Sequence, residues 1–157
     1  MEATLALSAY EIERGKPMPS KNHAIVQSNL LFQLRIHFGD MFTILPELTI
    51  DFLIRDGVPD LAIYKQVIFT PGEDEVVMTE IPLGLIEILS PQQGLQELMQ
   101  KRKEYFNAGV SSYWLVIPDL LTIYVYYSVE DYDVFTRQEP LFDKKLNIEL
   151  SLAEIFR

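Results

Sequence analysis

Two apolar runs in this chain each carry one acidic residue, and this combination constrains the fold more than any other feature. Residues 58–64 contain Asp60, and residues 85–91 contain Glu87. Runs rich in apolar and β-branched residues are typical of buried strands, where an unpaired charge is costly to desolvate. If the two strands are neighbours, their carboxylates repel each other, and a shared divalent cation is the simplest way to relieve the repulsion. The alternative is that one or both acids lie at exposed strand ends.

The composition predicts one soluble domain covering residues 1–157, because it shows no break along the chain. The hydrophobic share, 48%, is that of a chain with a packed core rather than a disordered one. The chain has no cysteine, which excludes disulfides, thiolate zinc sites and cysteine nucleophiles. Neither a signal-peptide pattern nor an apolar run near the ~20 residues of a membrane span is present. We therefore expect a cytoplasmic protein that does not enter a membrane.

The net charge of −10 argues against tight, indiscriminate binding to nucleic acid, which depends on Lys and Arg. The basic residues are clustered, however, at 101–103 and 144–145. The sequence therefore does not exclude a local DNA-binding site.

The order of expected elements is a helix, three strands, a second helix and then further strands, which predicts an α/β fold with a mixed sheet flanked by helices. Ser20 and Asn22 are candidate N-caps of the first helix, which should end near Phe38. An extended segment or short strand is expected at 10–18, and a solvated acidic loop at 71–75. The remaining expected elements are strands at 42–52, 58–64, 84–89 and 112–118, a hairpin at 121–127 and 132–136, and helices at 95–107 and 150–156.

Three polar residues of the second helix lie on one face, because Glu97, Lys101 and Tyr105 are spaced four apart. By spacing alone, Glu97 and Lys101 form an ordinary surface pair worth a few tenths of a kcal/mol. Their position in the chain suggests a role at the acidic residues instead. The helix starts just after the strand that carries Glu87, so its first turns can stand over the end of that strand and bring Lys101 to the acids.

A set of motifs in this order resembles the Uma-type family of putative restriction endonucleases, which belongs to the PD-(D/E)XK nuclease superfamily. The resemblance runs through nearly the whole chain and implies a restriction-endonuclease-like core. The motifs are Tyr10-Glu11-Ile12 with Gly15, Ser20 with His23, Pro59-Asp60, Glu87-Ile88-Leu89-Ser90-Pro91, Lys101 with Tyr105, Ala108-Gly109-Val110, and Tyr113-Trp114-Leu115-Val116.

The resemblance implies a catalytic site made of Asp60, Glu87 and Lys101. Leu89 occupies the position where the superfamily signature places its lysine, and the family moves that lysine to the following helix, where Lys101 stands. Asp60 and Glu87 would hold Mg²⁺ or Mn²⁺, with the carbonyl of Ile88 as a further candidate ligand. Lys101 would orient the attacking water or stabilise the developing negative charge.

Further residues are supporting candidates. Tyr105 could position Lys101 or touch a backbone phosphate, and Glu97 stands where family members commonly have aspartate. Glu11 and His23 also match the family pattern, although His23 could instead serve only as a local hydrogen-bonding group near the start of its helix. Ile117 replaces an acid that often precedes the proline in the Trp-Leu-Val strand, so any role of that acid is missing.

These residues lead to the hypothesis of a metal-dependent endonuclease that hydrolyses phosphodiester bonds of DNA. A catalytically inactive nuclease-fold protein that serves as a binding or regulatory module is the alternative, favoured by the low basic content and by Ile117. A third option is a structural homo-oligomer built through the aromatic hairpin. Trp114 and the tyrosines at 124, 126 and 127 are expected in a core or a dimer interface rather than in base stacking. A homodimer would also suit an enzyme that cuts two strands.

Overall fold

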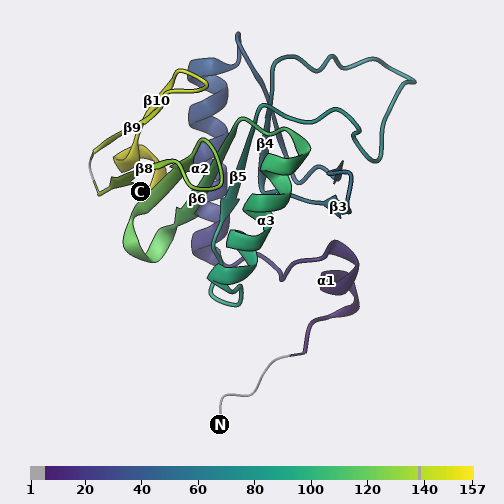
Figure 1. Ribbon diagram of the computed structural model, residues 1–157, viewed down its shortest axis with the longest axis horizontal. Helices are drawn as coiled ribbons and strands as arrows, with labels where there is room; N and C mark the ends of the chain where they lie inside the picture. The colour runs from purple at the N-terminus through teal and green to yellow at the C-terminus, as the bar shows by residue number, and fades with distance from the viewer. Residues whose placement is uncertain (1–5, 138) are drawn as a thin grey trace.

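A mixed six-stranded sheet forms the centre of the computed structural model, which describes residues 6–137 and 139–157 (Figure 1). β5 and β6 are parallel, and every other neighbouring pair of strands in this sheet is antiparallel. This arrangement confirms the predicted α/β fold with a mixed sheet. In spatial order the strands are β1 (Thr43–Pro46), β4 (Leu61–Tyr64), β5 (Gly84–Ile88), β6 (Ser112–Ile117), β7 (Thr122–Tyr126) and β8 (Tyr132–Thr136).

The two long helices cover opposite faces of the sheet, which therefore has a core on each side (Figure 1). α3 (Leu95–Ala108) connects β5 to β6, as parallel neighbours require a crossover. It packs on the face that carries Leu85 and Tyr113. α2 (Lys21–Phe38) packs on the face that carries Ile86 and Trp114. None of the helices in the described part of the chain is long and apolar enough to cross a membrane.

α2 begins where the sequence predicts. The Oγ atom of Ser20 accepts a hydrogen bond from the backbone N–H of His23 at 3.2 Å, so Ser20 is the N-cap and Asn22 lies inside the helix. Two apolar residues of this helix, Ile25 and Ile36, point away from the core and are 42% and 62% exposed. The buried stripe runs through Val26, Leu30 and Leu34, which are four residues apart.

Two expected strands differ from the structure. The segment at 10–18 contains α1 (Ala9–Arg14) rather than a strand, because Ser8 and Glu11 form a capping box and Gly15 ends the helix at a φ of 73°. The strand expected at 42–52 is broken by Glu47, whose φ is 55°. After this break, β2 (Ile50–Asp51) pairs with β3 (Asp56–Gly57) in a separate small hairpin.

The C-terminal part adds a small hairpin that the sequence does not reveal. β9 (Pro140–Asp143) pairs with β10 (Ile148–Ser151), and the predicted closing helix is shorter than expected, as α4 (Leu152–Ile155). A short 3₁₀ helix, η1 (Pro118–Leu120), follows β6. The acidic loop at 71–75 is exposed, as predicted.

The buried carboxylate of Asp143 fastens the β9–β10 hairpin to the central sheet. It accepts hydrogen bonds from the Ser112 hydroxyl and from Trp114 Nε1, the latter at 2.8 Å. It also accepts from the backbone N–H groups of Lys145 and Leu146 at 2.9 and 3.0 Å. Four donors of neutral groups therefore satisfy a carboxylate that is fully buried.

We expect Asp143→Ala to lower the free energy of unfolding by about 3 kcal/mol, because the donors on Ser112 and Trp114 would lose their acceptor inside the core. Urea unfolding followed by Trp114 fluorescence measures this change. Glu149→Ala, at an exposed position of β10, is the matched control and should change stability by less than about 0.5 kcal/mol. Equal effects of the two substitutions would contradict the role given to Asp143.

Candidate active site

Asp60 and Glu87 lie at the same end of two adjacent strands, Asp60 directly before β4 and Glu87 in β5. β4 and β5 are antiparallel, with Leu61 opposite Ile86, and continuing this register by one residue places Asp60 opposite Glu87. Both acids are only 1% exposed. Like charges directly opposite each other in a sheet are destabilising, so the surrounding groups must compensate both carboxylates.

Asp60 is compensated by donors from three parts of the chain. Its Oδ2 atom accepts from the backbone N–H of Ile88 at 2.7 Å and lies 3.1 Å from Nε2 of His23. Its Oδ1 atom lies 2.7 Å from the ammonium group of Lys16. Burial alone would raise the pKa of Asp60, but the hydrogen bond from His23 and the charge of Lys16 outweigh burial and lower this pKa to about 2.

Glu87 has weaker compensation, and it comes from α3. The phenol of Tyr105 donates a hydrogen bond to Oε1 of Glu87 at 2.7 Å, and Nζ of Lys101 lies 4.0 Å from the same oxygen. Burial, together with the negative charge of Asp60, raises the pKa of Glu87 to about 7. Asp60 thus keeps its charge easily, whereas Glu87 is charged at a cost that a nearby cation would remove.

Two groups that the sequence does not single out complete the cluster. Lys16, 7% exposed, lies in the segment between α1 and α2, and its Nζ atom is also 3.2 Å from Oε2 of Glu47. Glu47 follows β1, and its backbone N–H donates to the carbonyl of Asp60 at 3.2 Å. The side chain of Gln27 donates to that same carbonyl and to Glu47 Oε1. Lys16 thus contacts both Asp60 and Glu47, whereas Lys101 is the ammonium group beside Glu87.

A cavity of about 450 Å³ opens beside the acid pair. Lys16, Lys101 and Tyr105 line it together with Gly57 and Glu97, so the groups that contact the acids also face the cavity. Acidic side chains, Glu13, Asp56, Glu97 and Glu104, also line the cavity, so a ligand there would meet charges of both signs.

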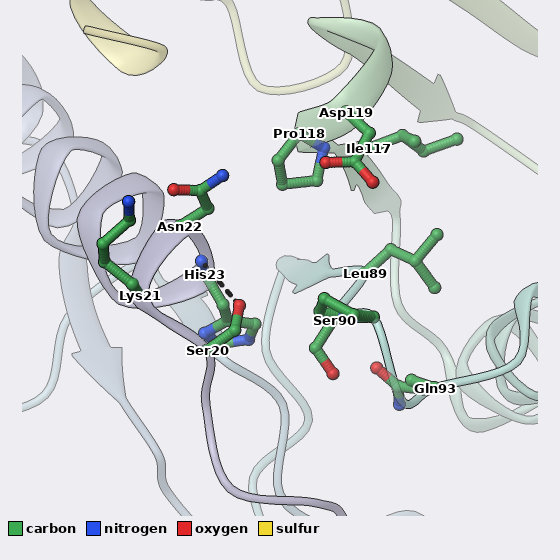
Figure 2. A pocket seen from close by; sticks show the side chains of 11 residues that line it. Ser20, Lys21, Asn22, His23, Leu89, Ser90, Gln93, Ile117, Pro118 and Asp119 are labelled. Carbon is green, nitrogen blue, oxygen red and sulfur yellow. Dashed lines mark hydrogen bonds between the residues drawn. The ribbon is translucent and has the colours of Figure 1, made fainter. Parts of the chain in front are cut away.

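A second cavity of about 400 Å³, lined by His23, lies between the start of α2 and the ends of β5 and β6 (Figure 2). Ser90 and Ile117 line it, and Asp119 reaches it from η1. The apolar side chain of Ile117 contributes no charge to this cavity.

The donor set suits a hard divalent cation such as Mg²⁺, which prefers carboxylate and carbonyl oxygens. Asp60 and Glu87 are buried, opposed and repel each other, and a cation between them would offset both charges. Among the described residues, no three histidine, aspartate or glutamate side chains are grouped as a ready-made metal cage. A metal here would therefore have two carboxylate ligands and keep several waters.

Comparison with known proteins places this chain in a family. The sequence profile of the Uma2 family, described as "Putative restriction endonuclease", matches residues 4–155. The chain belongs to the Uma2 family. A crystal structure described as a putative nuclease belonging to DUF820 from Anabaena variabilis ATCC 29413 is similar, with a TM-score of 0.77 and 24% sequence identity. The similarity covers 89% of this chain and 83% of that one, and it shows a shared fold. Among curated proteins, none matches.

The structure gathers most of the residues that the Uma2 resemblance singles out. Asp60, Glu87, Lys101 and Tyr105 lie together, as described above. The side chain of Glu97, 45% exposed, is 3.5 Å from Lys101, so this acid pairs with the lysine from the solvent side.

Three other candidates take more specific places. His23 makes two contacts. Its backbone N–H donates to the N-cap residue Ser20, and its ring contacts Asp60. Ile88 contributes its N–H to Asp60, and its carbonyl as a metal ligand stays a prediction. Glu11 remains with its own segment, where its carboxylate accepts from the backbone N–H groups of Ser8 and Met18.

Lys16 and Glu47 were missed for different reasons. Glu47 could have been found from strand register, because β1 pairs with β4 so that Pro46 lies opposite Leu61 and the next pair is Glu47 with Asp60. Lys16 carries no such signal, since it lies in a connection between two helices, between Gly15 and Pro17. Only the three-dimensional path of this segment brings its ammonium group to the acids.

We expect Tyr105→Phe to lower the free energy of unfolding in EDTA by about 1–2 kcal/mol, because Glu87 would lose a charge-assisted hydrogen bond while the ring packing stays. Urea unfolding measures the effect. Tyr113→Phe is a suitable control, since the Tyr113 hydroxyl makes only a long 3.4 Å bond to the carbonyl of Leu98. A loss as large in the control as in Tyr105→Phe would argue against a specific role of the bond to Glu87.

Proposed function

We propose that this protein is a metal-dependent endonuclease that hydrolyses phosphodiester bonds of DNA, with Asp60, Glu87 and Lys101 as the catalytic group. The observation that carries the proposal is the opposition of two buried carboxylates next to a lysine that lines an open cavity. The Uma2 family supports the same reaction class. The lack of cysteine fits a reducing, cytoplasmic compartment.

In the proposed mechanism, Asp60 and Glu87 hold Mg²⁺ or Mn²⁺, and the carbonyl of Ile88 is a further candidate ligand. The bound metal would supply a water of lowered pKa and would offset charge on the phosphate. His23 and the N–H of Ile88 fix the orientation of Asp60, and Tyr105 fixes Glu87. Lys101, on the cavity wall, would stabilise negative charge that develops on the substrate or orient the attacking water.

The direct test is cleavage of supercoiled plasmid DNA by the purified protein in the presence of Mg²⁺ or Mn²⁺. We expect nicking that EDTA abolishes. Asp60→Asn and Glu87→Gln should reduce it to background, since each removes a charged metal ligand. Lys101→Met should lower the rate by about 10²-fold or more.

Lys65→Met is the control for Lys101→Met, because Lys65 is an exposed lysine directly after β4, outside the basic cluster at 101–103. It should retain full activity. Cleavage that persists in EDTA, or full activity in Asp60→Asn, would contradict the proposed mechanism.

One observation favours a second function, that of an inactive nuclease-fold module which binds or regulates. The net charge is −10, and a chain with few basic residues binds the phosphate backbone weakly. This function predicts no cleavage with either metal, and no Mn²⁺ binding in calorimetry that depends on Asp60 and Glu87. Metal-dependent nicking by the wild-type protein would exclude it.

Two sites would allow both strands of a duplex to be cut in one binding event, and we propose that a homodimer provides them. The β8 edge of the sheet exposes Tyr132 and Val134, which are 46% and 39% exposed. Light scattering should give twice the mass of the chain, and Tyr132→Lys should shift the protein toward the monomer. A monomer at all concentrations, with and without DNA, would contradict this assembly.

A further inference from the structure

We propose that Lys16 is an internal cation that occupies the acid site in the metal-free protein, and that a divalent cation must compete with its ammonium group to bind Asp60. This inference rests on the proposed metal-dependent function and adds a residue that regulates access to the same site. It comes from the way the oxygens of Asp60 are occupied.

The two oxygens of Asp60 are not equally available. Oδ2 already accepts from the backbone N–H of Ile88 at 2.7 Å and from His23 Nε2 at 3.1 Å. Both partners belong to regular elements, β5 and α2, so they cannot move without disturbing the fold. Oδ1 is left as the oxygen with room for a metal, and its partner is Lys16, 2.7 Å away.

A metal on Oδ1 would come close to Lys16. Mg²⁺ binds oxygen at about 2.1 Å, so with Nζ of Lys16 2.7 Å from that oxygen, metal and nitrogen could be no farther apart than about 5 Å. Even with water-like screening, repulsion between charges of +2 and +1 at this distance weakens binding by about tenfold or more. A bound metal must therefore displace Lys16 from Oδ1, and this displacement lowers the affinity for the metal.

The segment that carries Lys16 is suited to such movement. α1, which precedes it, has six residues and exposes Tyr10 and Ile12, which are 60% and 67% exposed. In Figure 1, α1 stands apart from the central sheet. The carboxylate of Glu11 bonds within this segment, to Ser8 and Met18. The contacts of Lys16 with Asp60 and Glu47 thus join a weakly packed arm to the site.

The cavities put Lys16 at the entrance. It lines both the 450 Å³ cavity, which also contains Lys101 and Tyr105, and a small pocket of about 10 Å³ that reaches Asp60 and His23. An ion that enters from the large cavity therefore meets Lys16 before Asp60.

The test on the wild-type protein is chemical labelling of lysines with N-hydroxysuccinimide acetate, read by mass spectrometry. In EDTA, Lys16 should be protected, because it is 7% exposed. Saturating Mn²⁺ should raise its labelling several-fold, while exposed Lys103 is labelled equally in both conditions. No rise at Lys16 under Mn²⁺ that calorimetry shows to be bound would overturn the proposal.

A second test compares Mn²⁺ affinity by calorimetry. Lys16→Met removes the competing charge and should tighten binding by about tenfold or more, whereas Lys16→Arg and Lys103→Met should stay near wild type. Unchanged or weaker binding in Lys16→Met would overturn the proposal, since it would mean that Lys16 only orients Asp60. If Lys16→Met does not fold, labelling of the wild-type protein decides.

The outcomes separate this inference from the proposed function. Mn²⁺ binding that depends on Asp60 but not on Lys16 leaves the function standing and removes the role of Lys16. If Lys16→Met binds Mn²⁺ and the wild-type protein does not, Lys16 blocks the metal completely, which supports the proposed competition. If neither the wild-type protein nor Lys16→Met binds Mn²⁺, both proposals fall.

Discussion

The repulsion between Asp60 and Glu87 is the constraint on which the rest of this structure depends. Two carboxylates, each 1% exposed, lie at the same end of the adjacent strands β4 and β5. Burial makes each charge expensive, and the neighbouring charge adds to the cost. The compensating groups come from the arm before α2, from α2 itself, from β5 and from α3. The site therefore joins elements from both faces of the sheet.

A third buried acid shows how such a group looks when it is purely structural. Asp143 is held by four neutral donors, all from β6 or from the turn of its own hairpin. Asp60 and Glu87 instead rely in part on two lysines, both of which line a cavity. A ligand can replace compensating groups only if those groups can move, as a lysine side chain can. Perturbed pKa values beside a cavity also favour a functional site over a purely structural role.

Three features could be predicted because each follows from a local pattern. An apolar run with one charge indicates each acid, a four-residue spacing indicates the face of α3 that carries Lys101, and a helix between two strands indicates the mixed sheet. Other features are set by single backbone positions or by contacts distant in sequence. Glu47 turns the chain at a positive φ and breaks the expected strand. Glu11 makes a capping box and turns an expected strand into α1. Lys16 reaches Asp60, 44 residues away, through a connection with no periodic pattern.

The central claim is that Asp60 and Glu87 share one cation with Lys101 beside it. Anomalous scattering from crystals grown with Mn²⁺ tests this most directly. The account predicts one strong peak within about 2.5 Å of a carboxylate oxygen of each acid, with Lys101 on the cavity side. A peak elsewhere on the chain, or no peak at the acids in protein that cleaves DNA with Mn²⁺, would contradict it.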